Sequence, residues 1–294
     1  MPVVDMNYHA MIAPLGIIRF FQIFLSCTAF SLVASVNAYN GSYGAWCMFT
    51  WIFCFIVTVF IVLLELIGVC HKLPISWEDF TSAFSMLATL MIFTTSIIYP
   101  SVYLKGGCSG HICACMGSAT AMSILCFLAY AAEVGITRAK PGEISGFLST
   151  IPGLLKVFEA YVACLIFSLL DNGHLYNADP GRQWCMAVYC ICFIITTLII
   201  FLTIGRLLAS LPFPFEKFLI GYNVLAVLMY LSAAIVWPIF SFRNNNSRPT
   251  QCDSVPTCTW NSLLGATFLT YINLIAYIID LVYSTKMVFF TTPA

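Results

Sequence analysis

Two matching stretches decide the fold of this chain: Ala13–Leu32, APLGIIRFFQIFLSCTAFSL, and Thr150–Leu169, TIPGLLKVFEAYVACLIFSL. Each is an apolar run of the length that a helix needs to cross a bilayer, about 20 residues. Each carries one basic residue at the same position, Arg19 in the first stretch and Lys156 in the second. The pair therefore predicts a transmembrane helix that occurs twice in the sequence.

The composition of the whole chain points to a membrane location. Of 294 residues, 61% are hydrophobic and 8% are charged, whereas a soluble domain carries about 25% charged residues. So few charges cannot cover the surface of a water-soluble globule. The net charge is zero, which excludes a long-range field that attracts nucleic acid. The first apolar run is too long for a secretion signal, and we expect it to remain as an anchor.

Eight apolar stretches are long enough to span the membrane. We predict that all are helices, because isolated strands leave their backbone groups unsatisfied in lipid. The runs are also longer than the roughly ten-residue alternating segments of a membrane barrel. The predicted spans are 14–36, 46–69, 82–103, 112–133, 154–171, 185–208, 218–240 and 262–282. The predicted fold class is therefore an all-α integral membrane protein with eight transmembrane helices.

The match between the two halves extends beyond the first helix. Three further matches are Trp46-Cys47-Met48 with Trp184-Cys185-Met186, Tyr99-Pro100 with Trp237-Pro238, and Ala129-Tyr130 with Ala276-Tyr277. Four spans in each half give both halves the same orientation, so we predict two tandem four-helix bundles in parallel orientation. The predicted parts are an N-terminal tail 1–12, a first module 13–137, a linker 138–149, a second module 150–287 and a C-terminal tail 288–294.

The distribution of Lys and Arg orients the helices, because cytoplasmic loops carry an excess of these residues. With a cytoplasmic N-terminus, eight basic residues lie inside and four lie outside. We therefore predict that both termini are cytoplasmic. Two Asn-X-Ser sequons, at Asn40 and Asn245, fall in outside loops on this topology and are the candidate glycosylation sites.

Three segments of the chain resemble the MARVEL family of four-helix membrane proteins. They are Ala29–Val36, AFSLVASV; Thr137–Ile144, TRAKPGEI; and Ile151–Val157, IPGLLKV. The doubled form resembles the myeloid-associated differentiation marker branch of that family, and the resemblance runs from Pro14 to Val288. The short N-terminal tail departs from the longer Ser/Thr-rich tail of such proteins, which puts regulation through the tail in doubt.

The resemblance implies a non-enzymatic role. Proteins of this family are associated with cholesterol-rich membrane, vesicle trafficking and membrane apposition, and the doubled branch with small GTPase and cortical actin behaviour. We therefore expect a multi-pass protein that organises ordered domains of the plasma membrane and is also found in trafficking vesicles. Its expected partners are cholesterol-rich membrane lipids and other membrane or cortical proteins. The resemblance brings no catalytic residue and no cofactor.

The charged residues within the spans share a depth near the cytoplasmic helix ends: Arg19, Glu65, Glu133, Lys156, Glu159 and Asp280. Charged groups inside a span are functional candidates by default. A proton or ion pathway needs polar groups at several depths, whereas the middle of every predicted span has no charged residue. We therefore predict interfacial ion pairs, Arg19 with Glu133, and Lys156 with Asp280 or Glu159. These pairs would fix the fourth helix of each half against the first.

Small residues are expected where helices meet in lipid. Cys27 and Ser31 lie one turn apart, and Cys164 and Ser168 repeat them in the second half. We predict that these residues form a close-packed helix face.

The outside cysteines favour disulfides. We predict a bond between Cys252 and Cys258, and a second bond from Cys108 to either Cys113 or Cys115. A zinc site at the second group is less favoured, because zinc sites usually show two well-spaced ligand pairs.

Cys70 lies at the cytoplasmic edge of its span, where both S-palmitoylation and an unmodified thiol fit the sequence. The sequence has no glycine-rich phosphate loop, no His-Glu-X-X-His motif and no acidic metal motif, so we predict neither an enzyme nor a metal site. Two other functions stay open. Eight helices in two similar halves permit a channel or transporter, and the outside loop 242–260 permits an adhesion or receptor protein. The sequence does not indicate an oligomeric state.

Overall fold

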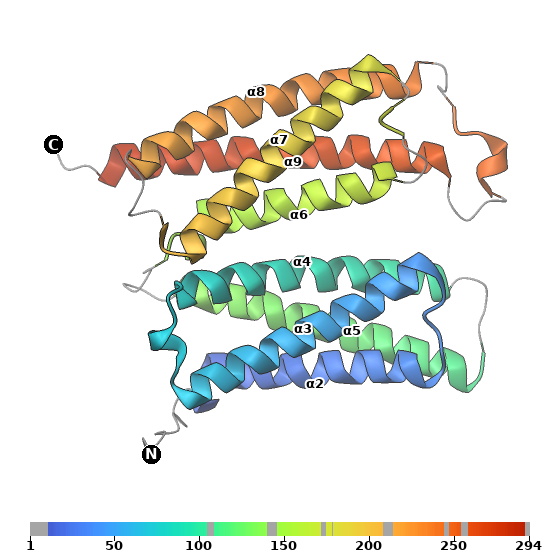
Figure 1. The fold of residues 1–294 in the computed structure, drawn as a ribbon. Coiled ribbons are helices and arrows are strands. Elements are labelled where there is room, and N and C mark those ends of the chain that lie inside the picture. The colour runs from blue at the N-terminus through green and yellow to red at the C-terminus, as the bar shows by residue number, and fades with distance from the viewer. Residues whose placement is uncertain are drawn as a thin grey trace. The chain divides into compact units, whose positions relative to one another are not determined.

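The structure is a computed structural model that describes residues 11–104, 109–139, 146–171, 175–177, 179–207, 214–243, 247–253 and 258–291. Its long helices are α2 Pro14–Ser35, α3 Gly41–Ile67, α4 Trp77–Tyr103, α5 His111–Ala139, α6 Ile151–Asp171, α7 Pro180–Ile204, α8 Phe215–Phe242 and α9 Thr259–Thr291 (Figure 1). Within the described part of the chain, eight helices are long and apolar enough to cross a membrane, and no residue is in a strand. This confirms the predicted fold class.

The chain divides into two compact units, Met1–Ser149 and Thr150–Ala294. In the first unit, α2 and α4 each pack against both α3 and α5, so that the four helices close into a bundle. In the second unit, α6 and α8 each pack against both α7 and α9. Figure 1 shows α3 and α7 crossing their own bundles obliquely. The repeat in the sequence is thus also a repeat of helix connectivity.

Several helices are longer than the apolar runs that predicted them. α3 begins at Gly41 instead of residue 46, and α4 begins at Trp77 instead of residue 82. The first turn of α4 contains two acidic residues, which hydropathy excludes from a span but which stabilise a helix N-terminus. α5 ends at Ala139 and α9 at Thr291. The first residues of the predicted linker and of the predicted C-terminal tail are therefore helical.

The buried face of the first helix in each unit follows one repeat. The buried residues include Arg19, Gln22, Ser26, Ala29 and Val33 on α2, and Lys156, Glu159, Ala163, Ile166 and Leu170 on α6. Their spacing alternates between three and four residues, which places each set on one face of its helix. Each buried face therefore contains the basic residue of its helix.

The predicted close-packed face of cysteines and serines is wrong. Ser31, Cys164 and Ser168 are exposed on the bundle surface, and Cys27 is half-buried. The reason is the rotation of the helix: a face that buries Arg19 or Lys156 turns these small residues outward. Close packing comes instead from alanines of other positions, such as Ala29 and Ala88, which are fully buried.

Neutral hydrogen bonds occupy the middle of each bundle. In the first unit, Trp51 Nε1 donates to Ser123 Oγ at 3.0 Å, and the hydroxyls of Thr58 and Tyr130 lie 2.6 Å apart. In the second unit, the equivalent pairs are Tyr189 with Thr270 at 2.7 Å and Thr196 with Tyr277 at 3.0 Å. Buried polar groups need partners in a medium without water, and here the helices satisfy one another.

Large apolar side chains cover the outer faces of the helices. Phe24, Ile56, Leu128, Phe201 and Leu228 are each more than half exposed. In water such a surface would be an association site, whereas in a bilayer it contacts lipid. The exterior therefore agrees with the membrane location indicated by the composition.

The register of α2 can be tested by overpacking. Ala29→Leu places extra methyl groups on the fully buried face and should lower the free energy of unfolding by about 1–3 kcal/mol. Ala34→Leu makes the same change at an exposed position of the same helix and should have little effect. Thermal unfolding of the two purified variants in mild detergent measures the difference. Equal unfolding temperatures would show that the helix is rotated differently.

Candidate functional site

A buried cation lies between two carboxylates in the first unit. Arg19 on α2 places Nη2 at 2.8 Å and Nε at 2.9 Å from Glu133 Oε1 on α5. Its Nη1 pairs with Glu65 on α3. The guanidinium group presents several donors in a fixed plane, so it can hold both acids together. The cluster thereby joins three of the four helices.

Neutral donors complete this first cluster. Gln22 Nε2 on α2 donates to Glu133 Oε2 at 2.6 Å. Trp77 Nε1 on α4 donates to Glu65 Oε1 at 3.0 Å, which connects the fourth helix to the cluster. The ion pair of Arg19 and Glu133 stands as predicted from the sequence, whereas the role of Glu65 was missed. Its position near the C-terminal end of α3, at the predicted depth of Arg19, was the available signal.

The second unit holds a cluster of the same kind around Lys156. Its Nζ lies 2.8 Å from Glu159 Oε2 on the same helix, α6, and 2.6 Å from Asp280 Oδ2 on α9. It also donates to Asn223 Oδ1 on α8 at 2.7 Å. Asp280 accepts a further bond from Ser284 Oγ at 2.9 Å. The sequence left Asp280 and Glu159 as alternatives, and the structure brings both to the lysine.

The two clusters differ in where the second acid sits. Aligned through the repeat, Gln22 of the first unit occupies the position of Glu159, and Thr203 of the second unit occupies the position of Glu65. The second acid therefore lies on α3 in the first unit and on α6, the helix that carries the cation, in the second unit. Glu65 keeps 23% of its side chain exposed, whereas Glu159 is fully buried.

The ion cluster of the second unit is fully buried within its helix bundle, whereas its depth relative to the membrane interface stays a prediction. Lys156, Glu159 and Asp280 have no exposed side-chain surface. The Lys156 ammonium also lies 4.9 Å and 5.0 Å from the ring centroids of Tyr222 and Tyr277, an attractive arrangement for a cation in a dry site. The sequence located these residues near a helix end, but their place on the inner helix face removes them from water.

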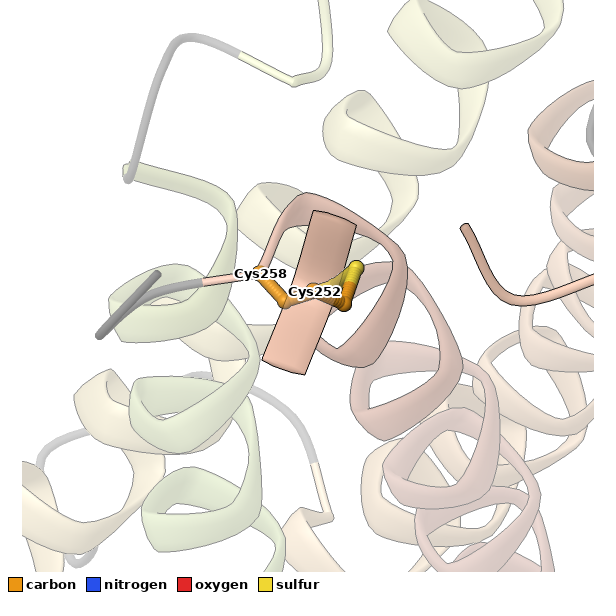
Figure 2. The surroundings of a disulfide bond; sticks show 2 residues. All are labelled: Cys252 and Cys258. Atoms are coloured by element: carbon orange, nitrogen blue, oxygen red, sulfur yellow. A yellow bond between two sulfur atoms is a disulfide. The ribbon is translucent and has the colours of Figure 1, made fainter. Parts of the chain in front are cut away.

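A disulfide bond lies at the start of α9. Cys252, in the short helix η4 Thr250–Asp253, is bonded to Cys258 immediately before α9 (Figure 2). Cys113 is also disulfide-bonded, whereas Cys115 is a free, buried thiol. The alternative that used Cys115 is therefore wrong: two residues further along α5, its side chain turns into the bundle. Cys108 lies outside the described residues.

The remaining candidate sites stay predictions. Asn40 is exposed directly before α3, and Asn245 lies outside the described residues. Cys70, in the short helix η1 Cys70–Lys72, is a free thiol with 9% of its surface exposed. Among the residues that the structure describes, no group of three or more His, Cys, Asp or Glu side chains is placed to hold a metal ion.

The end of the linker docks on the first unit. Leu148 N–H, in the short helix η2 Phe147–Ser149, donates to Asp79 Oδ1 on α4 at 2.7 Å. Ser149 and Ser82 bring their hydroxyls to 2.7 Å from each other. A Cβ added to Gly146 would lie 2.4 Å from Asp79 Oδ1, so only glycine allows this close approach. The linker therefore covers the N-terminus of α4.

Known proteins match this chain along nearly its full length. The MARVEL family model, described as a membrane-associating domain, matches residues 10–136 and 147–283. The myeloid-associated differentiation marker homolog of Xenopus laevis is 43% identical over 97% of this chain and 96% of its own length. The Homo sapiens myeloid-associated differentiation marker is 42% identical over 98% of this chain and 92% of its own length. The Mus musculus myeloid-associated differentiation marker-like protein 2 is 40% identical over 98% of this chain and 96% of its own length. No solved structure matches the chain.

Removing the buried lysine should strongly destabilise the second unit. Lys156→Met leaves Glu159 and Asp280 buried without their cation, and losing one partner of a buried ion pair costs about 3–5 kcal/mol. The matched control is Lys286→Met on α9, where the lysine is exposed and the change should cost less than about 0.5 kcal/mol. Denaturant unfolding in mild detergent measures both. Equal stabilities would contradict a structural role of the cluster.

The docked linker gives a prediction for hydrogen exchange. Gly146→Ala should push Asp79 away from the Leu148 N–H, so that exchange in the segment 146–150 becomes faster. Gly135→Ala is the control, because a Cβ there meets no atom within 4 Å. Exchange monitored by mass spectrometry compares the two variants. Unchanged protection in Gly146→Ala would show that the linker does not depend on this contact.

Proposed function

The chain belongs to the MARVEL family of membrane-associating proteins, and we propose that it is a non-enzymatic organiser of ordered plasma-membrane domains. On this proposal it also takes part in membrane trafficking and in cortical and adhesion behaviour. Both termini are cytoplasmic, and the protein also passes through trafficking vesicles. Its relatives are named as differentiation markers, and their names state no catalytic activity.

The length of the lipid-facing surface is the observation that carries this proposal. On α8, exposed large apolar side chains extend from Phe218 to Ile239. At 1.5 Å per residue this stretch is about 32 Å long. The sterol-rich plasma membrane has a hydrocarbon thickness of about 32–33 Å, compared with about 27 Å for the endoplasmic reticulum. A matched hydrophobic length favours residence in the thicker, more ordered membrane.

The interior of the bundles supports organisation over transport. A channel or proton relay needs polar groups that continue through several depths. In the first unit, the charged layer at Arg19 gives way to the neutral contacts of Trp51 with Ser123 and Thr58 with Tyr130. These side chains are fully buried and bonded to one another across helices. They join the helices and leave the outer surface to interact with lipid and with other membrane proteins.

Protein partners would reach the protein from the cytoplasm or sideways within the membrane. The proposed cytoplasmic contacts are the segments 70–79, 134–150 and 206–217, and the proposed partners are cortical proteins, including small GTPase or actin-linked ones. The docked residues 146–149 are already in contact with α4.

The proposal predicts partition into ordered membrane. A fluorescent version should be enriched in the ordered phase of giant vesicles shed from plasma membrane. A variant with Ile97, Val102, Ile235 and Ile239 changed to Asn shortens the apolar belt at exposed positions of α4 and α8 and should move to the disordered phase. The matched control changes the same four residues to Ala, which keeps the belt apolar.

Phase imaging decides between the outcomes. The proposal is supported if the unaltered protein and the Ala control are enriched in the ordered phase and the Asn variant is not. This result would show that hydrophobic length places the protein in ordered membrane. Exclusion of the unaltered protein from the ordered phase would contradict the proposed function.

A further inference from the structure

The second cluster carries one negative charge too many for its surroundings. Lys156 faces two acids, Glu159 and Asp280, and all three side chains are fully buried. The first cluster has the same count, but Glu65 is partly exposed, so that water can solvate its carboxylate. An uncompensated ion in a dry interior is strongly unfavourable. The second cluster therefore needs a compensating positive charge.

The neighbouring helices supply no second cation. The groups next to the cluster are Cys192 on α7, Asn223 and Tyr222 on α8, and Asn273, Tyr277 and Ser284 on α9. All of them are neutral near pH 7 at their ordinary acidities. Within the described residues, Arg206, Lys217 and Lys286 are exposed, and none of them pairs with Glu159 or Asp280.

One carboxylate oxygen of the second cluster, Glu159 Oε1, also receives no hydrogen bond from the described residues. Glu159 Oε2 pairs with Lys156, whereas Glu159 Oε1 is buried and accepts no hydrogen bond among the described residues. The Glu159 and Asp280 carboxyl groups are brought towards each other because both bind the same ammonium, Lys156 Nζ, at 2.8 Å and 2.6 Å. Two ionised carboxylates have only acceptors to offer. One proton on the pair turns one of them into a donor and makes this approach favourable.

The equivalent residue of the first unit shows which hydrogen bond a side chain at the position of Glu159 can make. Gln22, its equivalent through the repeat, uses Nε2 to donate to Glu133, the equivalent of Asp280, at 2.6 Å. The amide at this position is thus a permanent donor towards the acid of the fourth helix. A glutamic acid can make the same bond only when it is protonated.

We propose that Lys156, Glu159 and Asp280 form a proton-binding site, in which Glu159 carries one proton at neutral pH. The proton comes from water and forms an O–H bond on a carboxyl oxygen of Glu159. The cluster then has no net charge. Loss of the proton at raised pH leaves a buried negative charge, so the folded second unit binds more protons than the unfolded chain. Its stability should fall as pH rises.

Infrared spectroscopy of the full chain in lipid nanodiscs tests this site. A protonated carboxyl group has a C=O stretch that is separate from the carboxylate and amide bands and shifts in D2O. The unaltered protein should show this band at neutral pH and lose it at raised pH. Either Glu159→Gln or Asp280→Asn should abolish it, because the remaining acid is then neutralised by Lys156. Glu65→Gln, in the first unit, should keep the band.

The outcomes separate clearly. A spectrum of the unaltered protein without a protonated carboxyl band overturns the proposal, whatever the variants do. A band that persists in both second-unit variants, or disappears in Glu65→Gln, overturns the assignment to this cluster. Glu159→Gln introduces the residue that the first unit already has at this position, which favours a folded variant. These results do not depend on the partition experiment, so the two proposals can fail separately.

Discussion

One basic side chain held between two carboxylates connects the helices of each module. Arg19 joins α2 to α3 and α5, and Trp77 adds α4 through Glu65. Lys156 joins α6 to α9 and α8. In lipid the hydrophobic effect does not drive helices together, so packing and polar contacts must do so. A buried ion cluster also specifies register, because any rotation of the first helix leaves a charge unpaired.

Other features of the fold follow from that register. Once α2 turns Arg19 inward, Ala29 faces the core and Ser31 faces lipid. The neutral hydroxyl and indole contacts then fall in the middle layer, where both modules repeat them at equivalent positions. Thr58 with Tyr130 and Thr196 with Tyr277 keep the same pairing. The two halves have thus kept one geometry, although the second acid lies on α3 in the first module and on α6 in the second.

The sequence predicted the eight spans, the repeat and the pairing of Arg19 with Glu133 and of Lys156 with Glu159 or Asp280, because long apolar runs and rare charges are strong signals. It did not predict which face of α2 and of α6 is buried in the bundle. Small residues such as Cys27 and Ser31 fit either a packed or a lipid-facing surface, and only the position of the cation decides between them. The partner Glu65 was missed because its helix pairing depends on the oblique path of α3 (Figure 1). The start of α4 was missed because hydropathy excludes the acidic residues of its first turn, Glu78 and Asp79.

The most direct test of this account is a double-mutant cycle on Arg19 and Glu133. Arg19→Met, Glu133→Gln and the double variant are unfolded in mild detergent, and the coupling free energy is taken from the four stabilities. If the cluster holds the first module together, the coupling should be about 2 kcal/mol or more, because the double variant leaves only the partly exposed Glu65 without its cation. A coupling below about 0.5 kcal/mol, typical of independent sites, would show that packing alone sets the bundle.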